Sequence, residues 1–277
     1  MNAVIRVTGL YVYPIKSCGG LTLERTQLEA RGPVYDRRWM IVDGHGTFVS
    51  QRELPRLALI QPSFAGDMLA LTAPAMPPIA VPLQQQATAR KLPVVVWRDA
   101  CLGLDEGDAV ADWFSAFLDA PVRLVRMADG FVRPVDRRYA REAAQVGFAD
   151  AYPLLLIGQA SLDDLNARLK ARGKAALPMN RFRPNVVVAA SPAYAEDDWR
   201  LIRVGEVLLD LVKPCARCVT TTVDQSRGEV TDKDEPLATL ATYRRGANGV
   251  LFGQNAIHRS LGVLTVGDEV KLLAAAE

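Results

Sequence analysis

The chain has 277 residues, 49% of them hydrophobic and 23% charged, which is ordinary for a globular protein of one large or two medium domains. Its 33 basic and 31 acidic residues nearly cancel, so the net charge of +2 does not indicate a nucleic-acid partner. Four cysteines are too few for a disulfide scaffold at this length. No apolar run approaches the roughly 20 residues of a membrane-spanning helix, and a strand-like pattern starts at Val4 without a signal or transit peptide. We therefore expect a soluble, cytoplasmic protein.

Most of the chain is predicted to form short strands, because runs of β-branched and aliphatic residues alternate with Gly, Pro and Asp turns. In chain order the predicted strands are residues 4–13, 34–42, 56–61, 68–73, 92–97, 186–189, 207–212 and 219–223. A strand, a turn and a second strand are expected to close the chain at residues 264–270. Many short strands with few helices favour a mainly β or α+β fold built on a barrel or sandwich.

Three segments show helical periodicity. Asp108 is predicted to cap the first helix. Its apolar residues repeat at the spacing of an amphipathic stripe and are Val110, Trp113, Phe114, Phe117 and Leu118. Ser161, with Asp164 three residues on, is predicted to open the second helix, which Gly173 ends. Pro236 is expected in the first turn of the third, where its missing N–H has no cost.

A domain boundary is predicted near Ala120-Pro121, just after the first helix, which gives domains of residues 1–120 and 121–277. The stretch 129–141 is rich in Arg and Asp and has little apolar periodicity. It is therefore expected to be an extended, solvated loop.

A Cys-x-x-Cys pair, Cys215 and Cys218, stands between two predicted strands. Thiolate sulfur selects soft metals, and the flanking Lys213 and Arg217 would lower the pKa of a neighbouring thiol. Three interpretations compete: a zinc site, a redox dithiol, or ordinary buried thiols in a turn. A zinc site needs a second ligand pair, whereas the other candidates are isolated, at Cys18, Cys101, His45 and His258. A redox dithiol should open a helix, whereas a strand is predicted after Cys218.

Two basic motifs lie in the first half of the chain. Lys16 and Ser17 follow Tyr13-Pro14, and Lys16 is either a solvated lysine at a strand end or a donor to a bound phosphate. Arg37 and Arg38 fall in a predicted strand, so their side chains should point to opposite faces. Only one of them should face a site, unless both belong to a salt-bridged surface pair.

Two further motifs precede apolar runs in the second half. Asn185, in Arg183-Pro184-Asn185, stands before a valine run. Its amide both donates and accepts hydrogen bonds, which suits a ligand edge that presents both, although Asn is also common in turns at strand boundaries. Asp150 stands before the apolar run 154–157.

In their order and spacing these motifs resemble the MOSC family, the molybdenum cofactor sulfurase C-terminal domain. The segments that carry the resemblance are Tyr13-Pro14-Ile15-Lys16-Ser17-Cys18, Arg181-Phe182-Arg183-Pro184-Asn185 and Arg217-Cys218 with the residues up to Asp224. The most similar branch is that of the amidoxime-reducing component proteins. The resemblance spans nearly the whole chain. It implies a strand-rich α+β protein in which a β-barrel MOSC domain packs against an N-terminal MOSC-associated β-barrel domain, with the molybdenum cofactor at their junction.

The resemblance also assigns roles to residues. Cys218 matches the cysteine that bonds molybdenum, so it is the expected metal ligand and catalytic residue, whereas Cys215 is expected to pack beside it. The expected cofactor-binding residues are Lys16, Ser17, Arg37, Asp150, Arg183, Asn185 and Arg217. The chain departs from the family at Arg38, where an aromatic residue is common. It departs again at Ala151 and Tyr152, where relatives have small hydroxyl residues.

The activity implied by the resemblance is that of a molybdopterin-dependent oxidoreductase. Its substrates would be N-hydroxylated compounds such as amidoximes, hydroxylamines and N-hydroxylated bases, from which molybdenum takes the oxygen atom while water is released. Pyridoxal phosphate is not expected. The alternative is a carrier of molybdenum cofactor or sulfur that uses Cys218 without turnover.

Electrons are expected to come from a separate protein. The sequence has no flavin fingerprint, haem-attachment motif or iron–sulfur cysteine cluster, and it ends at Glu277 without the ferredoxin domain that some relatives carry. The expected partner is a ferredoxin, flavodoxin or cytochrome b5-like protein with its reductase; neither nucleic acid nor a membrane is expected. A basic patch is predicted to receive an acidic carrier, formed by Arg133, Arg137, Arg138 and Arg141.

Overall fold

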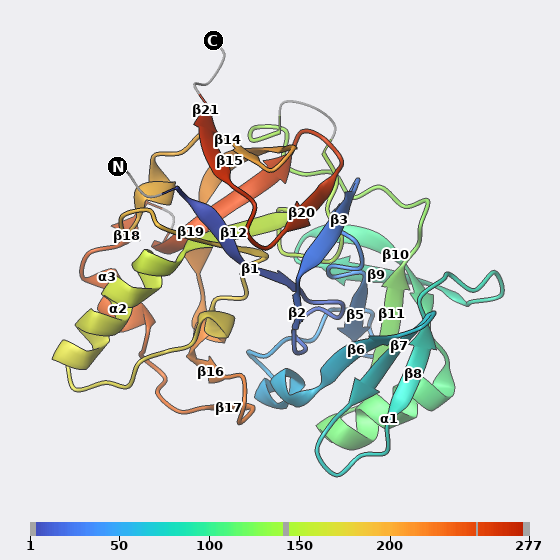
Figure 1. Cartoon of the computed structure of the whole chain (residues 1–277). Helices are drawn as coiled ribbons and strands as arrows, with labels where there is room; N and C mark the ends of the chain where they lie inside the picture. The colour runs from blue at the N-terminus through green and yellow to red at the C-terminus, as the bar shows by residue number, and fades with distance from the viewer. Residues whose placement is uncertain (1–3, 141–143, 248, 274–277) are drawn as a thin grey trace.

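The computed structural model describes residues 4–140, 144–247 and 249–273 (Figure 1). Two strand-rich halves lie side by side, one around a large curved sheet and the other around two smaller sheets with a covering helix. The predicted strand-rich α+β class is therefore confirmed. No helix within the described ranges is long and apolar enough to cross a membrane.

The larger half is one sheet that curls into a barrel. Its strand order is β2-β1-β13-β12-β19-β15-β14-β21, with β18 paired to β19. The sheet closes because β21 returns to β1: the Val270 amide donates to the Ile5 carbonyl at 2.8 Å, and Arg6 forms a bridge with Glu269. Aliphatic side chains fill the interior, as in other small barrels. The strands are β1 (Arg6–Val12), β2 (Leu21–Leu23), β12 (Leu154–Gly158), β13 (Val186–Ala189), β14 (Leu201–Val204), β15 (Val207–Arg217), β18 (Arg245–Gly246), β19 (Gly249–His258) and β21 (Val270–Leu273).

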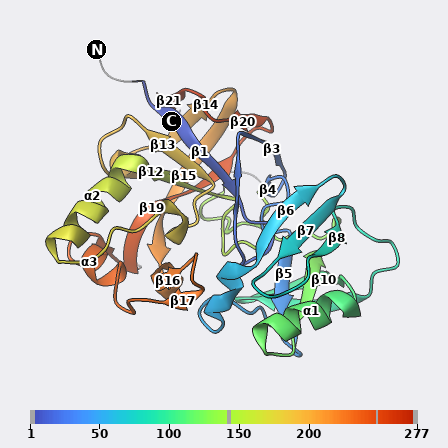
Figure 2. The same ribbon diagram turned by 60° about the horizontal axis from the view of Figure 1, so that its bottom comes forward.

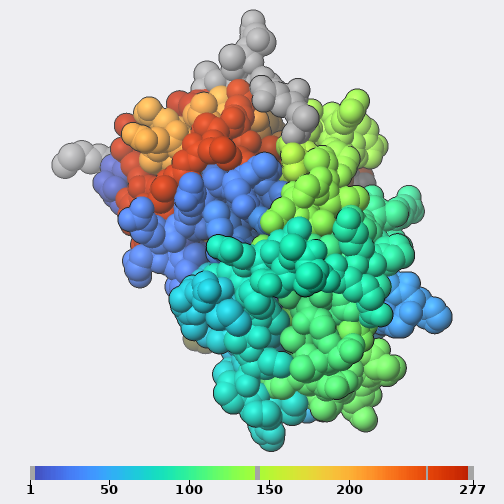
Figure 3. All heavy atoms as spheres, turned by 90° about the vertical axis from the view of Figure 1, so that its right-hand side faces the viewer, coloured from blue at the N-terminus to red at the C-terminus, as the bar shows by residue number. Residues whose placement is uncertain are grey.

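The opening segment of the chain joins the two halves. β1 pairs with β13 inside the barrel, and β3 (Arg25–Glu29) pairs with both β4 (Gly32–Pro33) and β20 (Val263–Thr265). Figure 3 shows this blue segment lying between the red C-terminal strands and the cyan and green middle of the chain. The barrel therefore takes strands from both sides of the predicted boundary near residue 120.

The smaller half contains two antiparallel sheets and helix α1 (Asp108–Leu118), as Figure 2 shows. The apolar stripe predicted for this helix is buried against the sheets, where Trp113, Phe114 and Phe117 share a core with Trp39 and Ile41. One sheet has the order β5-β11-β10-β9 and the other β6-β7-β8. Their strands are β5 (Trp39–Val42), β6 (Gln61–Ala65), β7 (Met68–Thr72), β8 (Ile79–Pro82), β9 (Lys91–Val96), β10 (Asp99–Asp105) and β11 (Arg123–Met127).

The predicted helices are present, with shifted starts. α1 has Gly107 as its N-cap, so Asp108 lies in its first turn and does not cap it. α2 (Gln159–Ala171) begins before Ser161, whose hydroxyl donates to the buried Glu196 carboxylate at 2.7 Å. Gly173 follows its end with φ +70°, and Pro236 is the N-cap of α3 (Leu237–Ala241). The remaining short elements are η2 (Met179–Arg181), η3 (Ala195–Asp197), β16 (Val223–Asp224) and β17 (Glu229–Val230).

Two predicted strands are 3₁₀ turns. Residues 219–222 form η4 (Val219–Thr222), because the Thr221 and Thr222 hydroxyls donate to the carbonyls of Cys218 and Val219 at 2.9 and 2.8 Å and compete with strand pairing. The expectation that a strand follows Cys218, used above against a redox dithiol, is therefore wrong. The predicted strand 56–61 is mostly η1 (Pro55–Leu59), where proline suits the first turn.

Candidate functional site

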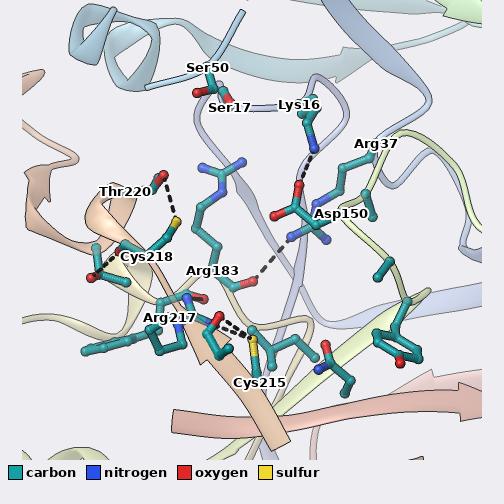
Figure 4. Close-up of a pocket in the computed structure, with 18 of the residues that line it drawn as sticks. Lys16, Ser17, Arg37, Ser50, Asp150, Arg183, Cys215, Arg217, Cys218 and Thr220 are labelled. Atoms are coloured by element: carbon teal, nitrogen blue, oxygen red, sulfur yellow. Dashed lines mark hydrogen bonds and ion pairs between the residues drawn. The ribbon is translucent and has the colours of Figure 1, made fainter. Parts of the chain in front are cut away.

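A pocket of about 910 Å³, measured out to its open mouth, lies between the two halves. Figure 4 shows side chains converging on it from the turn after β1, the loops of the smaller half and the end of β15. All eight predicted site residues line it, namely Lys16, Ser17, Arg37, Asp150, Arg183, Asn185, Arg217 and Cys218.

Lys16, Arg37 and Arg183 form a cation cluster at the buried end of the pocket. Lys16 is 7% exposed, and its Nζ donates to the Phe148 carbonyl at 2.9 Å and to Asp150 Oδ1 at 2.5 Å. Burial lowers the pKa of Lys16, and the Asp150 carboxylate opposes that shift. Because burial disfavours the charged ammonium group, a bound anion would stabilise it, as the Asp150 carboxylate does.

The two arginines of the cluster stack on one aromatic ring. The Arg183 and Arg37 guanidinium carbons lie 4.2 and 4.4 Å from the Tyr13 ring centre. Arg37 Nη1 donates to Asp36 Oδ2 at 2.5 Å, and Arg183 Nη1 donates to the Cys18 carbonyl at 2.7 Å. Burial lowers the pKa of Arg183 to about 10, so the group stays charged at neutral pH.

The positive charge of the cluster exceeds the negative charge of the carboxylates that contact it. Three cations face only two contacting carboxylates, those of Asp36 and Asp150, and Arg183 Nη2 is buried without a hydrogen-bond partner among the described residues. An unpaired buried donor on a charged group is costly. An anionic ligand that accepts from Arg183 would remove that cost, so the residues present fit a phosphate-bearing group.

Asn185 holds this cluster in place. Its side chain is 2% exposed, its Oδ1 accepts from Arg37 Nη1 and the Leu155 amide, and its Nδ2 donates to the Tyr11 carbonyl. The amide therefore already bonds to protein groups at both ends, although it lines the pocket. Its contacts fix the Arg37 guanidinium relative to β1 and β12.

Arg37, not Arg38, faces the pocket. Neither residue lies in a regular strand, because β5 begins at Trp39 and Arg37 has φ +44°; the predicted strand 34–42 is therefore too long. Arg38 turns away from the pocket and forms ion pairs with Glu29 and Asp129.

Cys218 is the pocket cysteine whose surroundings favour the thiolate form. Its Sγ accepts from Arg52 Nη2 at 3.4 Å and is hydrogen-bonded to Thr220 Oγ1 at 3.4 Å. Burial alone would raise the pKa of Cys218, but the hydrogen bonds with Thr220 and Arg52 outweigh burial and lower it. Among the described residues no group of three or more His, Cys, Asp or Glu side chains could hold a metal ion, so zinc has no ligand set here.

Cys215 occupies a different environment. Arg217 Nη1 donates to its Sγ at 3.0 Å, while Arg217 Nη2 donates to the Phe182 carbonyl at 2.6 Å. Lys213 points elsewhere, with its Nζ 4.8 Å from the Tyr139 ring centre. The cation that contacts Cys218 is therefore Arg52 and neither of the two flanking residues named from the sequence.

Of the predicted basic patch, Arg133 is not a surface residue, whereas Arg137 and Arg138 are exposed. Arg133 is 3% exposed and donates to Asp99 and to the carbonyls of Gly147, Ala149 and Asp150. Its guanidinium organises the loop before β12, so the expectation of a solvated loop is wrong at this position. The exposed Arg138 pairs with Asp136, and Arg141 lies outside the described residues.

The sequence motifs did not identify one wall of the pocket. Phe48, Ser50 and Arg52 come from the segment after β5, and Trp97 comes from the turn between β9 and β10. The Arg52 guanidinium carbon lies 4.4 Å from the Trp97 ring centre. We call Arg52 and Trp97 the mouth pair. In the sequence Trp97 ends the predicted strand 92–97, and no motif gives it a role in a site.

Two domain families match the chain with this geometry: the MOSC N-terminal beta barrel domain over residues 4–121 and the MOSC domain over residues 143–271. The chain therefore belongs to the MOSC family, as its motifs indicated. Its relatives include the mitochondrial amidoxime-reducing component 1 of Mus musculus, 38% identical over 99% of this chain and 84% of the relative. The proteins of the same name in Homo sapiens and Xenopus laevis are 35% and 33% identical, over 99% and 95% of this chain and 84% and 81% of their own lengths.

Proposed function

We propose that the chain binds the molybdenum cofactor in this pocket and reduces N-hydroxylated compounds with electrons from a separate protein. The observation that carries the proposal is that one pocket holds both the cation cluster, with its unpartnered Arg183 nitrogen, and the Cys218 sulfur, which accepts from Arg52. The relatives, 33–38% identical, bear the name amidoxime-reducing component, which supports the same activity.

Each side chain has a distinct part in holding such a group. Lys16, Arg37 and Arg183 would bind the cofactor phosphate, with Arg183 Nη2 gaining the acceptor it lacks. Cys218 would supply the soft protein ligand to the metal. Asn185 would position Arg37. When bound, the cofactor supplies the two-electron redox chemistry of molybdenum that no side chain can provide.

The remaining predicted residues would act at the edges of the cofactor. Arg217 ties the Cys215 sulfur to the Phe182 carbonyl and so fixes the strand end that presents Cys218. Ser17 lines the pocket with φ +70°, and its carbonyl accepts from Gln51. Asp150 balances the Lys16 charge, and its side chain is 65% exposed at the mouth.

Electron supply is the direct test of the proposed activity. Because the chain carries no recognised flavin, haem or iron–sulfur motif, NADH alone should give no turnover of benzamidoxime with the purified protein. Reduced viologen, or a reductase with a one-electron carrier, should restore it. Turnover with NADH alone would contradict an external donor. A protein that holds molybdenum but shows no turnover with any of these donors would instead be the cofactor or sulfur carrier. The cytoplasmic location stays a prediction.

A further inference from the structure

Trp97 occupies a turn position that its side chain does not favour. β9 and β10 are joined by the two-residue turn Trp97-Arg98, since Val96 pairs with Asp99. Trp97 has φ +59°, which lies in the left-handed region. In hairpin turns this region is normally occupied by Gly, Asn or Asp. Bulky residues kept in such strained positions cluster at functional sites. The turn therefore gives no local reason for tryptophan.

The indole of Trp97 is held in a fixed orientation and is nevertheless exposed. Its Nε1 donates to Asp150 Oδ1 at 2.9 Å, and the ring centre lies 5.0 Å from that of Phe48. Trp97 is 44% exposed, whereas the three other tryptophans of the chain are buried, namely Trp39, Trp113 and Trp199. An anchored aromatic surface thus borders the pocket, and nearly half of it stays exposed to a molecule that enters.

Arg52 connects this surface to the expected metal ligand. Its guanidinium stacks on Trp97 while Nη2 reaches Cys218 Sγ at 3.4 Å. No carboxylate lies within ion-pair distance of Arg52 in the described part of the chain, unlike Arg37, which pairs with Asp36. Arg52 therefore keeps donor capacity for a ligand that rests on the exposed part of the indole beside it.

We propose that the mouth pair is a stacking platform that selects flat, conjugated N-hydroxylated substrates over compact ones. The proposal rests on the function proposed above and names the substrate class of the same site. A planar amidoxime conjugated to an aromatic ring can stack on the indole while its oxygen accepts from Arg52. Hydroxylamine has no flat surface to stack.

The test compares Trp97→Asn, whose new residue suits the left-handed turn, with Trp97→Phe, which keeps a ring. Phe64→Ala is the matched control, because Phe64 is an exposed aromatic residue outside the pocket. Binding of benzamidoxime is measured by calorimetry and by tryptophan emission, so the readout does not depend on turnover. Molybdenum content and kcat/KM for benzamidoxime and hydroxylamine are measured on the same preparations.

Benzamidoxime should quench the emission of the wild-type protein but not that of Trp97→Phe. Trp97→Asn should weaken benzamidoxime binding about tenfold, about 1.4 kcal/mol, in line with the loss of one stacked ring. It should also lower kcat/KM for benzamidoxime about tenfold more than for hydroxylamine, and Phe64→Ala should change neither value.

An unchanged dissociation constant in Trp97→Asn, or equal losses for both substrates, would overturn the platform. So would a loss seen with a protein donor but not with reduced viologen, which would make the mouth pair a docking surface. If wild-type protein binds benzamidoxime through Trp97 but reduces nothing, the platform stands and the proposed activity fails.

Discussion

The two ends of the pocket differ in how they are built. At the buried end, the arginines of the cation cluster are held by a backbone carbonyl and by Asp36 and Asn185, with one arginine nitrogen left free. At the exposed end, the mouth pair comes from loops of the smaller half, where Arg52 stacks on Trp97 and Asp150 accepts from both Trp97 and Lys16. The contrast supports the proposal that the buried end holds an anionic cofactor, whereas the exposed end meets the substrate.

The largest effect is expected at the sulfur that joins the two ends. Cys218→Ser replaces a soft ligand by a hard, neutral hydroxyl and should abolish benzamidoxime reduction. Cys215→Ser is the control in the same pocket and should keep most of the activity, because Cys215 contacts Arg217 and lies away from the mouth pair. Steady-state assays with reduced viologen measure both. Complete loss in both variants would indicate a two-cysteine metal site.

The next effect tests the buried end. Arg183→Ala removes charge-assisted hydrogen bonds of about 1.5–3 kcal/mol, which should weaken cofactor binding and lower pterin content several-fold or more. Lys16→Ala and Arg37→Ala should lower it in the same direction.

Arg38→Ala is the matched control for these variants, because Arg38 is also buried but pairs with Glu29 and Asp129 away from the pocket. Fluorescence of the extracted pterin reports occupancy, and thermal melting of the cofactor-free protein reports folding. Normal pterin content in Arg183→Ala would show that the cation cluster does not bind the cofactor.

A smaller effect separates the cysteines by pH in protein made without the cofactor. The thiolate is the form that alkylates, so the rate at Cys218 should rise with pH with its midpoint below the ordinary pKa of 9.0, because hydrogen bonds with Thr220 and Arg52 lower that pKa. Burial raises the pKa of Cys18 to about 12, so Cys18 should stay unmodified at neutral pH. Peptide mass spectrometry after iodoacetamide treatment follows both sites.

Arg52→Ala should move the midpoint of the Cys218 alkylation profile to higher pH, because the thiolate loses its guanidinium donor. A midpoint at or above pH 9 in the unsubstituted protein would show that the thiolate is not stabilised.

The sequence was sufficient to predict an element and its buried residues where apolar residues follow a clear helical or strand pattern. The α1 stripe and the valine strand after Asn185 were predictable, since burial follows from periodicity. The strand predicted after Cys218 failed because threonine favours strands by propensity but can also bind its own backbone.

Other features depended on tertiary contacts that local sequence does not show. Arg133 is expected to be solvated from the local sequence. In the structure it is buried, and its guanidinium donates to three carbonyls of the loop before β12. Arg52 and Trp97 are distant in sequence and meet only because the β9–β10 turn folds over the segment after β5.

The most direct test of the account is the molybdenum and pterin content of the chain purified from a host that makes the cofactor. Elemental analysis and pterin fluorescence should give equal molar amounts of molybdenum and pterin, each approaching the molar amount of protein. Arg183→Ala should lower both together, whereas Arg38→Ala should retain them. Protein that folds normally yet carries neither molybdenum nor pterin would contradict the account.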